Sequence, residues 1–296
     1  MNLTTYFKDF ENFLKLERNL SKNTIQSYRS DLKKFEVFLL KTNVKELKYI
    51  NPEIVREFLY EQSKKVTGKT QGRIISTLRS FYNFLVLEKI AENNPIEDID
   101  YPKIDSKVPF VLSTNEIDKI ILQASLTKFG TRNQTMIEVM YSCGLRVSEV
   151  IEMKISNIFF DESLIKVLGK GKKERFVPLS GIAKKLLYNY IEFERKESKF
   201  DKQSVDIVFL NNRGGKLSRI MLYNIINDAA LAAEITSKIS PHTLRHSFAT
   251  HLIENGADII SIQKMMGHEN IVTTEKYLNV NKKHLVETVI KYHPRK

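Results

Sequence analysis

Apolar residues recur at steps of three and four along the first part of the chain, and this periodicity restricts that part to helices. One such face follows Ser21, a suitable helix N-cap, and consists of Ile25, Tyr28, Leu32, Phe35 and Leu39. Asn51-Pro52 introduces another helix, and a further one carries the apolar stripe from Ile74 to Leu85. The pattern from Leu3 to Leu87 therefore predicts a compact bundle of about four helices.

The composition changes between Lys89 and Pro109, where three prolines are spaced through an acidic stretch: Pro95, Pro102 and Pro109. Prolines and charges of this kind are typical of a boundary between domains. We therefore predict a first domain at residues 1–103, a linker at 104–108 and a second domain at 109–296.

The second domain is predicted to be mainly α with a small β element. Ser113 and Glu116 form a capping-box pattern ahead of the next helix. Residues 164–168 and 174–179 are rich in β-formers and flank Gly169-Lys170-Gly171-Lys172, which predicts a hairpin with lysine at its tip. A short strand is expected at 206–210, and helices interrupted at Gly256 and Gly267 follow.

The charge balance favours a polyanionic partner. The 296 residues contain 47 Lys and Arg against 35 Asp and Glu, a formal net charge of +12. Residues 1–103 hold 18 basic and 14 acidic side chains and the remainder holds 29 and 21, so both parts are basic. A generally solvated basic surface gives the same totals, but a nucleic acid held by both parts is the functional interpretation.

From the cysteine content and the hydropathy of the chain we expect a cytoplasmic protein. The single cysteine, Cys143, excludes an intramolecular disulfide framework, and its apolar neighbours indicate a small buried side chain. The first residues lack a basic segment followed by an apolar run, and no stretch of about 18 uncharged apolar residues occurs. We therefore expect neither a membrane span nor a membrane partner.

Four clusters in the second domain could carry chemistry, although each has an ordinary interpretation. Arg146 follows a glycine-broken helix end, where an arginine is most often a surface charge. The hairpin lysines could form a solvated turn or reach a DNA phosphate. His242 and Arg245 lie roughly 60° apart on one helix, with Leu244, Phe248 and Leu252 as its packing stripe. The fourth cluster is Gly267-His268 followed by Tyr277.

Metal and nucleotide cofactors are not implied. His242 and His246 have the i, i+4 spacing of a zinc helix, but the glutamate of His-Glu-x-x-His is absent and no cysteine is near. No Walker loop or Gly-x-Gly-x-x-Gly fingerprint occurs. The clusters instead suit metal-free attack on a phosphodiester: arginines can clamp the non-bridging oxygens, a lysine can protonate a leaving oxygen and a tyrosine can be the nucleophile.

The order and context of these residues resemble the tyrosine recombinase (phage integrase) family. The motifs are Gly-Leu-Arg146, Gly-Lys170-Gly, Pro-His242-Thr-Leu-Arg245-His, Gly-His268 and Thr-Thr-Glu-Lys-Tyr277. Each is weak alone, but five in order at workable spacing are specific. Leu20–Tyr28, Asn94-Pro95 and the ending His293-Pro-Arg resemble the Xer branch, so the resemblance spans nearly the whole chain.

The resemblance implies a SAM-like four-helix core-binding domain and an α-rich catalytic domain. In the latter, Tyr277 would attack the scissile phosphate to give a 3′-phosphotyrosyl link, with Arg146 and Arg245 binding its oxygens. Lys170, or alternatively Lys172 or Lys173, would protonate the leaving 5′-oxygen. His242 and His268 would hold the phosphate and assist proton movement. Glu149 is either an orienting partner of Arg146 or an ordinary surface glutamate.

The same resemblance implies partners and a biological role. Double-stranded DNA would be the substrate, bound by a homo- or heterotetramer with a second Xer-type recombinase. A septal DNA translocase (FtsK-like) would regulate resolution of chromosome dimers at a dif-like site through a four-way junction. An integrase or invertase of a mobile element would use the same chemistry, and a non-catalytic DNA-binding module is the alternative of another class. The segment from Lys282 to Lys296 is an amphipathic helix that packs on its own domain or docks on a neighbouring protomer.

Overall fold

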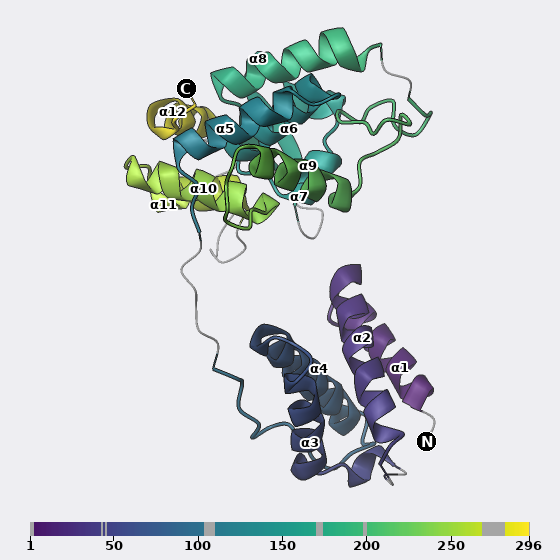
Figure 1. The fold of residues 1–296 in the computed structure, drawn as a ribbon. Helices are drawn as coiled ribbons and strands as arrows, with labels where there is room; N and C mark the ends of the chain where they lie inside the picture. Colours follow the sequence, from purple (N-terminus) through teal and green to yellow (C-terminus); the bar gives the residue numbers. More distant parts are fainter. Residues whose placement is uncertain are drawn as a thin grey trace. The chain divides into compact units, whose positions relative to one another are not determined.

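The computed structural model describes residues 3–42, 44, 46–103, 110–169, 174–197, 200–267 and 282–295. Its contacts divide the chain into two compact units, Met1–Lys107 and Val108–Lys296 (Figure 1). Each unit has its own cluster of buried apolar side chains. The predicted linker at 104–108 lies outside the described residues. None of the described helices has the length and apolar character needed to cross a membrane.

The described part of the first unit is helical, as the apolar periodicity predicts. Its helices are α1 (Leu3–Leu16), α2 (Lys22–Leu39), η1 (a 3-10 helix, Leu47–Tyr49), α3 (Pro52–Ser63) and α4 (Gly68–Leu87). The predicted cap of α2 is confirmed, because the Ser21 hydroxyl accepts a hydrogen bond from the Thr24 N–H at 3.2 Å. Asn51 caps α3 in the same way, with Pro52 at the first helical position.

Aromatic side chains fill the centre of the first unit. Phe10 on α1 packs edge-on against Phe81 on α4 with ring centroids 5.3 Å apart. The ring centroid of Phe35 on α2 lies 5.0 Å from that of Phe58 on α3. These rings are fully buried, so they combine the hydrophobic effect of large side chains with favourable ring geometry. All four α-helices thus share one core, and the predicted bundle is confirmed.

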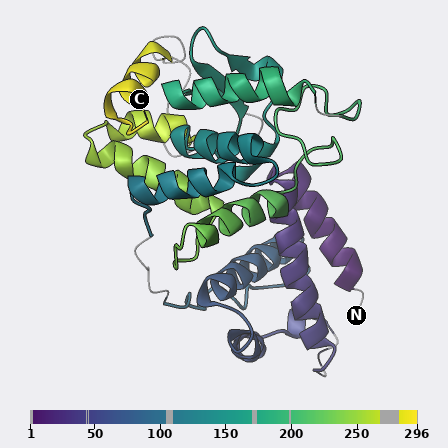
Figure 2. The ribbon, with the colours of Figure 1, turned by 45° about the horizontal axis from the view of Figure 1, so that its top comes forward.

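The second unit is also mainly helical. Its helices are α5 (Thr114–Ser125), α6 (Gly130–Ser142), α7 (Val147–Ile151), η2 (Ile155–Asn157), α8 (Gly181–Asn189), the π-helical turn η4 (Tyr190–Arg195), α9 (Arg219–Ala232), α10 (Pro241–Glu254), α11 (Ile259–Met266) and α12 (Lys282–Tyr292). The predicted capping box of Ser113 and Glu116 starts α5. Helix α6 is buried between α5 and α8, which lie along it (Figure 1, Figure 2).

A small antiparallel sheet interrupts the helices of the second unit. Its strands are β1 (Ile158–Phe159), β2 (Leu164–Leu168) and β3 (Glu174–Pro178), in the order β1-β2-β3. In the β2–β3 pair, Ile165 is opposite Val177 and Val167 is opposite Arg175. The predicted hairpin strands are therefore confirmed. Residues 170–173, which join β2 to β3, lie outside the described residues.

The predicted strand at 206–210 is wrong. The segment makes only isolated bridges, from Ile207 to Lys154 and from Leu210 to Lys216. Its carbonyl groups have other partners: the Arg195 guanidinium donates to the Ile207 carbonyl at 3.0 Å, and Arg132 donates to the Leu210 carbonyl at 2.8 Å. Arg132 from α6 and Arg195 from η4 thus satisfy backbone carbonyls that would otherwise need a strand partner.

The C-terminal helix packs on its own unit in this single chain. Leu285 and Val289 on α12 are buried within the core of the second unit. Helix α12 contacts β3, α10 and α11. Beyond the helix, His293 is fully buried, and Arg295 is paired with Asp118 and with Glu138. The predicted amphipathic helix is therefore confirmed over Lys282–Tyr292, four residues shorter than predicted, and its apolar face is covered by its own unit.

Candidate active site

Arg146 is placed by a tight turn at the end of α6. The turn uses Gly144, whose φ of +57° is in the left-handed region that favours glycine. Arg146 then becomes the N-cap of α7, and its side chain keeps 33% of its surface exposed. Its backbone N–H donates to the Glu149 carboxylate at 2.8 Å. The start of α7 therefore fixes the backbone of Arg146 while the guanidinium stays accessible.

Glu149 is the centre of the cluster. Its carboxylate is only 2% exposed and accepts a hydrogen bond from the Arg146 guanidinium at 3.0 Å. Arg175 on β3 donates two further hydrogen bonds to it, at 2.6 and 2.9 Å. Glu149 therefore contacts Arg146, and its interpretation as an ordinary surface glutamate is wrong. Parallel bonds of this bidentate kind are the strongest that arginine makes with a carboxylate.

Arg245 reaches the cluster from α10. Ser240 caps this helix, and the predicted stripe of Leu244, Phe248 and Leu252 is fully buried. Arg245 itself is buried; its guanidinium donates to the Gly144 carbonyl at 2.6 Å and lies 3.9 Å from a Glu149 oxygen. The core therefore holds α10 in the orientation that aims Arg245 at the turn beside Arg146.

The charges in the cluster shift two pKa values. Burial alone would raise the pKa of Glu149, but the hydrogen bonds and positive charges of Arg175 and Arg146 outweigh it and lower that pKa. Burial and the neighbouring positive charges lower the pKa of Arg245 to about 10. Glu149 is therefore ionised and Arg245 is protonated at neutral pH.

Three arginines converge on the C-terminus of α11. Arg175 donates to the Met265 carbonyl at 2.8 Å, Arg245 donates to the Met266 carbonyl, and Arg146 donates to the Gly267 carbonyl at 3.0 Å. The last carbonyls of a helix lack partners within the helix and carry partial negative charge, so cations stabilise them. The arginine cluster is thereby attached to the segment that leads directly into residue 268.

Three of the six predicted site residues lie among the residues that the structure describes. Arg146 and Arg245 are brought together, and His242 lies exposed in the first turn of α10. Lys170, His268 and Tyr277 lie outside the described residues, as do Lys172 and Lys173. In sequence, Lys170 belongs to the connection between β2 and β3, whereas His268 and Tyr277 belong to the connection between α11 and α12.

Sequence reasoning assigned no role to Arg175, which follows the hairpin lysines. A signal was present in the alternation of β3. Arg175 pairs with the buried Val167 and stands two residues before the buried Val177, so it belongs to the inward face of the hairpin. An arginine on an inward face needs a partner, and here that partner is Glu149.

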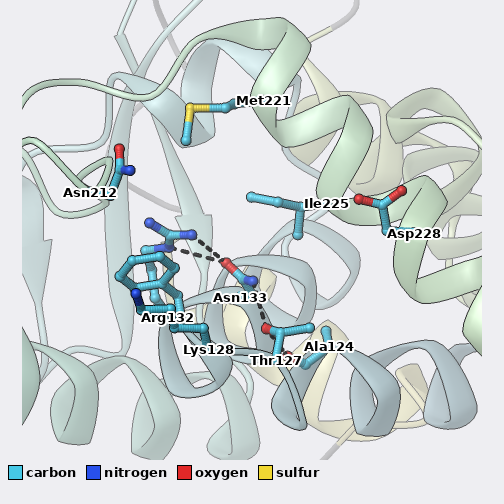
Figure 3. Close-up of a pocket in the computed structure, with 10 residues that line it drawn as sticks. Ala124, Thr127, Lys128, Arg132, Asn133, Asn212, Met221, Ile225 and Asp228 are labelled. Atoms are coloured by element: carbon cyan, nitrogen blue, oxygen red, sulfur yellow. Dashed lines mark hydrogen bonds between the residues drawn. The ribbon is translucent and has the colours of Figure 1, made fainter.

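A pocket of about 260 Å³ lies elsewhere in the second unit, where the start of α6 faces α9 (Figure 3). None of the predicted site residues lines it. Its buried Arg132 donates to Asn133 and to the Leu210 carbonyl, as Figure 3 shows for Asn133. These bonds join α6 to the segment at 206–210. Among the described residues, no group of three or more His, Cys, Asp or Glu side chains could hold a metal ion.

The chain matches known protein families and solved structures. Residues 111–284 match the phage integrase family, and residues 7–89 match the N-terminal SAM-like domain of phage integrases. The solved XerA recombinase is 31% identical, with a TM-score of 0.51 and 99% of both chains covered. XerH recombinase bound to palindromic difH substrate shares the fold at 24% identity, with a TM-score of 0.73 over 95% of this chain and 83% of that one.

Relatives that match over their whole length place the chain in one branch of the family. The chain is 39% identical to tyrosine recombinase XerD of Staphylococcus saprophyticus subsp. saprophyticus over 295 residues, covering 99% of this chain and 100% of the relative. Identity to tyrosine recombinase XerD of Staphylococcus aureus is 37% over 297 residues, with the same coverage. The chain therefore belongs to the phage integrase family and, within it, to the Xer branch of the tyrosine recombinases, enzymes that cut and rejoin DNA.

Proposed function

We propose that this recombinase resolves chromosome dimers at a dif-like site and that Arg146 and Arg245 clamp the scissile phosphate. The observation that carries the assignment of the clamp is the meeting of these two arginines around Glu149 at the end of α11. Guanidinium groups bind phosphate oxygens in a bidentate manner and neutralise the charge that builds in the transition state. The exposed part of Arg146 provides the face toward the phosphate.

The remaining catalytic roles are proposed from the motifs. The Tyr277 oxygen attacks phosphorus, which forms the phosphotyrosyl bond and breaks the bond to the 5′-oxygen. Lys170 gives a proton to that oxygen, and His242 and His268 hold the phosphate and assist removal of the tyrosine proton. The phosphodiester count is unchanged, so the reverse attack by a 5′-hydroxyl rejoins DNA without ATP. Strand exchange follows when that hydroxyl belongs to another duplex.

We propose that the first unit also binds DNA. Residues 1–103 are then the core-binding domain and residues 109–296 the catalytic domain. A polar depression of about 350 Å³ on this unit is lined by α2 and α4 residues: Asn23, Gln26, Ser27, Ser30 and Arg73. Amide, hydroxyl and guanidinium groups of this kind bind phosphates and base edges. The net positive charge of residues 1–103 adds an attraction to the DNA backbone that does not depend on the DNA sequence.

Assembly on DNA follows from the same proposal. Lambda integrase has been solved as a tetramer bound to a Holliday junction, and it shares this fold at 19% identity. We propose a tetramer here as well, either of this chain alone or with a second Xer-type recombinase, and a septal DNA translocase as its regulator. An integrase or invertase of a mobile element would use the same active site, so the DNA site that is cut decides between these roles.

The test uses nicked suicide duplexes that carry candidate recombination sites, incubated with EDTA and without ATP. Wild type and the matched control Tyr188→Phe, which alters an exposed tyrosine of the same unit, are expected to form an adduct that survives denaturant. Tyr277→Phe is expected to bind the duplex without forming it. Binding without an adduct by the wild type, even after a partner recombinase is added, would leave a non-catalytic DNA-binding module as the function.

A further inference from the structure

Arg175 makes contacts that differ from those of the two proposed clamp arginines. Two of its nitrogens donate to the two oxygens of Glu149, and the third donates to the Met265 carbonyl. Its side chain is 13% exposed, against 33% for Arg146. A Cβ atom on Gly267 would lie only 3.2 Å from the Cδ and Nε atoms of Arg175, so the guanidinium fits closely against the end of α11. Arg175 is therefore held in one place, facing protein rather than solvent.

We propose that Arg175 is a positioning residue of the recombination reaction. It supplies two of the hydrogen bonds that the Glu149 carboxylate accepts, so that Arg146 gives this carboxylate only one guanidinium hydrogen bond and Arg245 stays 3.9 Å away. The rest of both guanidinium groups then remains available to the scissile phosphate. This inference rests on the proposed function, because it assumes that those two arginines form the phosphate clamp.

Competition for the carboxylate gives the physical reason. A buried carboxylate needs donors, and leaving it short of them costs more than the same loss at a surface. Arg175 supplies two of the strong donors that Glu149 accepts. Without them, Arg146 at 3.0 Å and Arg245 at 3.9 Å are the cations near enough to replace them among the described residues. Arg146, which already donates one hydrogen bond to Glu149, and Arg245 would then be drawn further toward this carboxylate and away from the phosphate.

The net charge of the three arginines and Glu149 also supports a positioning role for Arg175. Three arginines around one carboxylate leave a surplus of two positive charges. Attack of a phenolate on a singly charged diester builds up two negative charges in the transition state, so this surplus matches the charge to be stabilised. Loss of Arg175 reduces the surplus to one. Loss of Arg175 and of the Glu149 charge together restores it to two.

A lysine could not do the same work. The planar guanidinium reaches both carboxylate oxygens and a carbonyl in fixed directions, whereas an ammonium group is a compact point charge. Arg175→Lys therefore keeps the charge count but loses the paired hydrogen bonds. Its activity separates the contribution of charge from that of geometry.

The test measures single-turnover adduct formation on the suicide duplex at saturating protein. We expect Arg175→Gln to slow the rate about tenfold to hundredfold, and Arg175→Lys to slow it less. The double variant Glu149→Gln/Arg175→Gln is expected to react about tenfold faster than Arg175→Gln alone. Lys166→Gln, which removes an ion pair with Glu174 on the same hairpin, is the matched control and is expected to react at the wild-type rate.

Duplex affinity and circular dichroism show whether each variant is folded. If Arg175→Gln does not fold, Arg175→Lys and the double variant carry the comparison. A wild-type rate for Arg175→Gln would overturn the proposal, and so would a double variant no faster than the single one, because a merely structural role gives no rescue. Failure of the wild type itself to form an adduct would instead contradict the proposed function.

Discussion

Gly144 lies directly against the ring of Phe248: a Cβ atom added to this glycine would come within 2.4 Å of the Phe248 Cδ1 atom. The same glycine has a φ of +57°, and its carbonyl accepts the hydrogen bond from Arg245. The core residue that packs α10 thus also determines how closely Arg245 approaches the turn beside Arg146. Gly144 therefore both packs against the core through Phe248 and holds Arg245 of the proposed phosphate clamp.

Gly144→Ala is expected to lower the free energy of unfolding by about 3 kcal/mol, because left-handed strain adds to a clash with a buried ring. It should also slow adduct formation by displacing Arg245. Gly256→Ala is the matched control: its φ is +94°, but the nearest atom to a new Cβ is 3.7 Å away, so only about 1 kcal/mol should be lost. Urea denaturation measures both, and equal losses would show that the Phe248 contact adds nothing.

Lysine substitutions should distinguish the two clamp arginines. Arg245 is buried and donates to two carbonyls, so Arg245→Lys is expected to abolish adduct formation and to lower stability by about 2 kcal/mol. Arg146 is one-third exposed, so Arg146→Lys should abolish the adduct with less than about 1 kcal/mol of destabilisation. Thermal melts and the suicide-duplex assay make the comparison. Equal destabilisation by both variants would contradict the difference in burial.

The sequence predicts those features that depend on near neighbours. The cap at Ser21, the capping box of Ser113 and Glu116, and the hairpin strands all follow from residues close together in the chain. The expectation at 206–210 is wrong because the partners of that segment, Arg132 and Arg195, come from other elements. β-Forming residues alone do not reveal a backbone group that is already satisfied by a distant side chain.

The candidate site likewise has some residues that the sequence predicts and others that only the structure reveals. The motifs identify Arg146 and Arg245, since each has a recognisable local context. Arg175 and the burial of Glu149 do not follow from motifs, because their pairing joins β3 to α7 across 26 residues. The attachment of the arginines to α11 is visible only in three dimensions, where three consecutive carbonyl groups accept hydrogen bonds from them.

Asp31 is expected to be important for the stability of the first unit. It is fully buried on α2 and is paired with Arg73, with a further hydrogen bond from Thr77 at 3.2 Å. Asp31→Asn leaves the Arg73 charge without its partner, so about 2 kcal/mol should be lost after allowing for the exposed part of Arg73. Glu53→Gln, which breaks the exposed pair with Arg56, should leave denaturation unchanged. A loss below that of ordinary surface substitutions would contradict a structural role for this pair.

His293 should make the second unit sensitive to acid. Its ring is fully buried between Tyr141 and Phe248, with centroid distances of 5.0 and 5.4 Å. Its Nδ1 atom accepts a hydrogen bond from the Arg295 N–H at 3.0 Å, and Nε2 has no partner among the described residues. Burial, helped by the charges of His251 and Arg295, lowers the pKa of His293 to about 3. The folded protein therefore keeps this imidazole neutral.

The sign of the pH effect follows from proton binding. Between the ordinary histidine pKa of about 6.5 and the folded value of about 3, the unfolded chain binds a proton that the folded chain excludes, so stability falls as the pH falls through this range. At pH 5 the loss attributable to His293 is expected to be roughly 2 kcal/mol relative to pH 7.5. Urea denaturation of wild type and His293→Asn at both pH values isolates it, because other groups, including Glu138 and His251, titrate in both proteins. A variant as acid-sensitive as the wild type would mean that another group carries the effect.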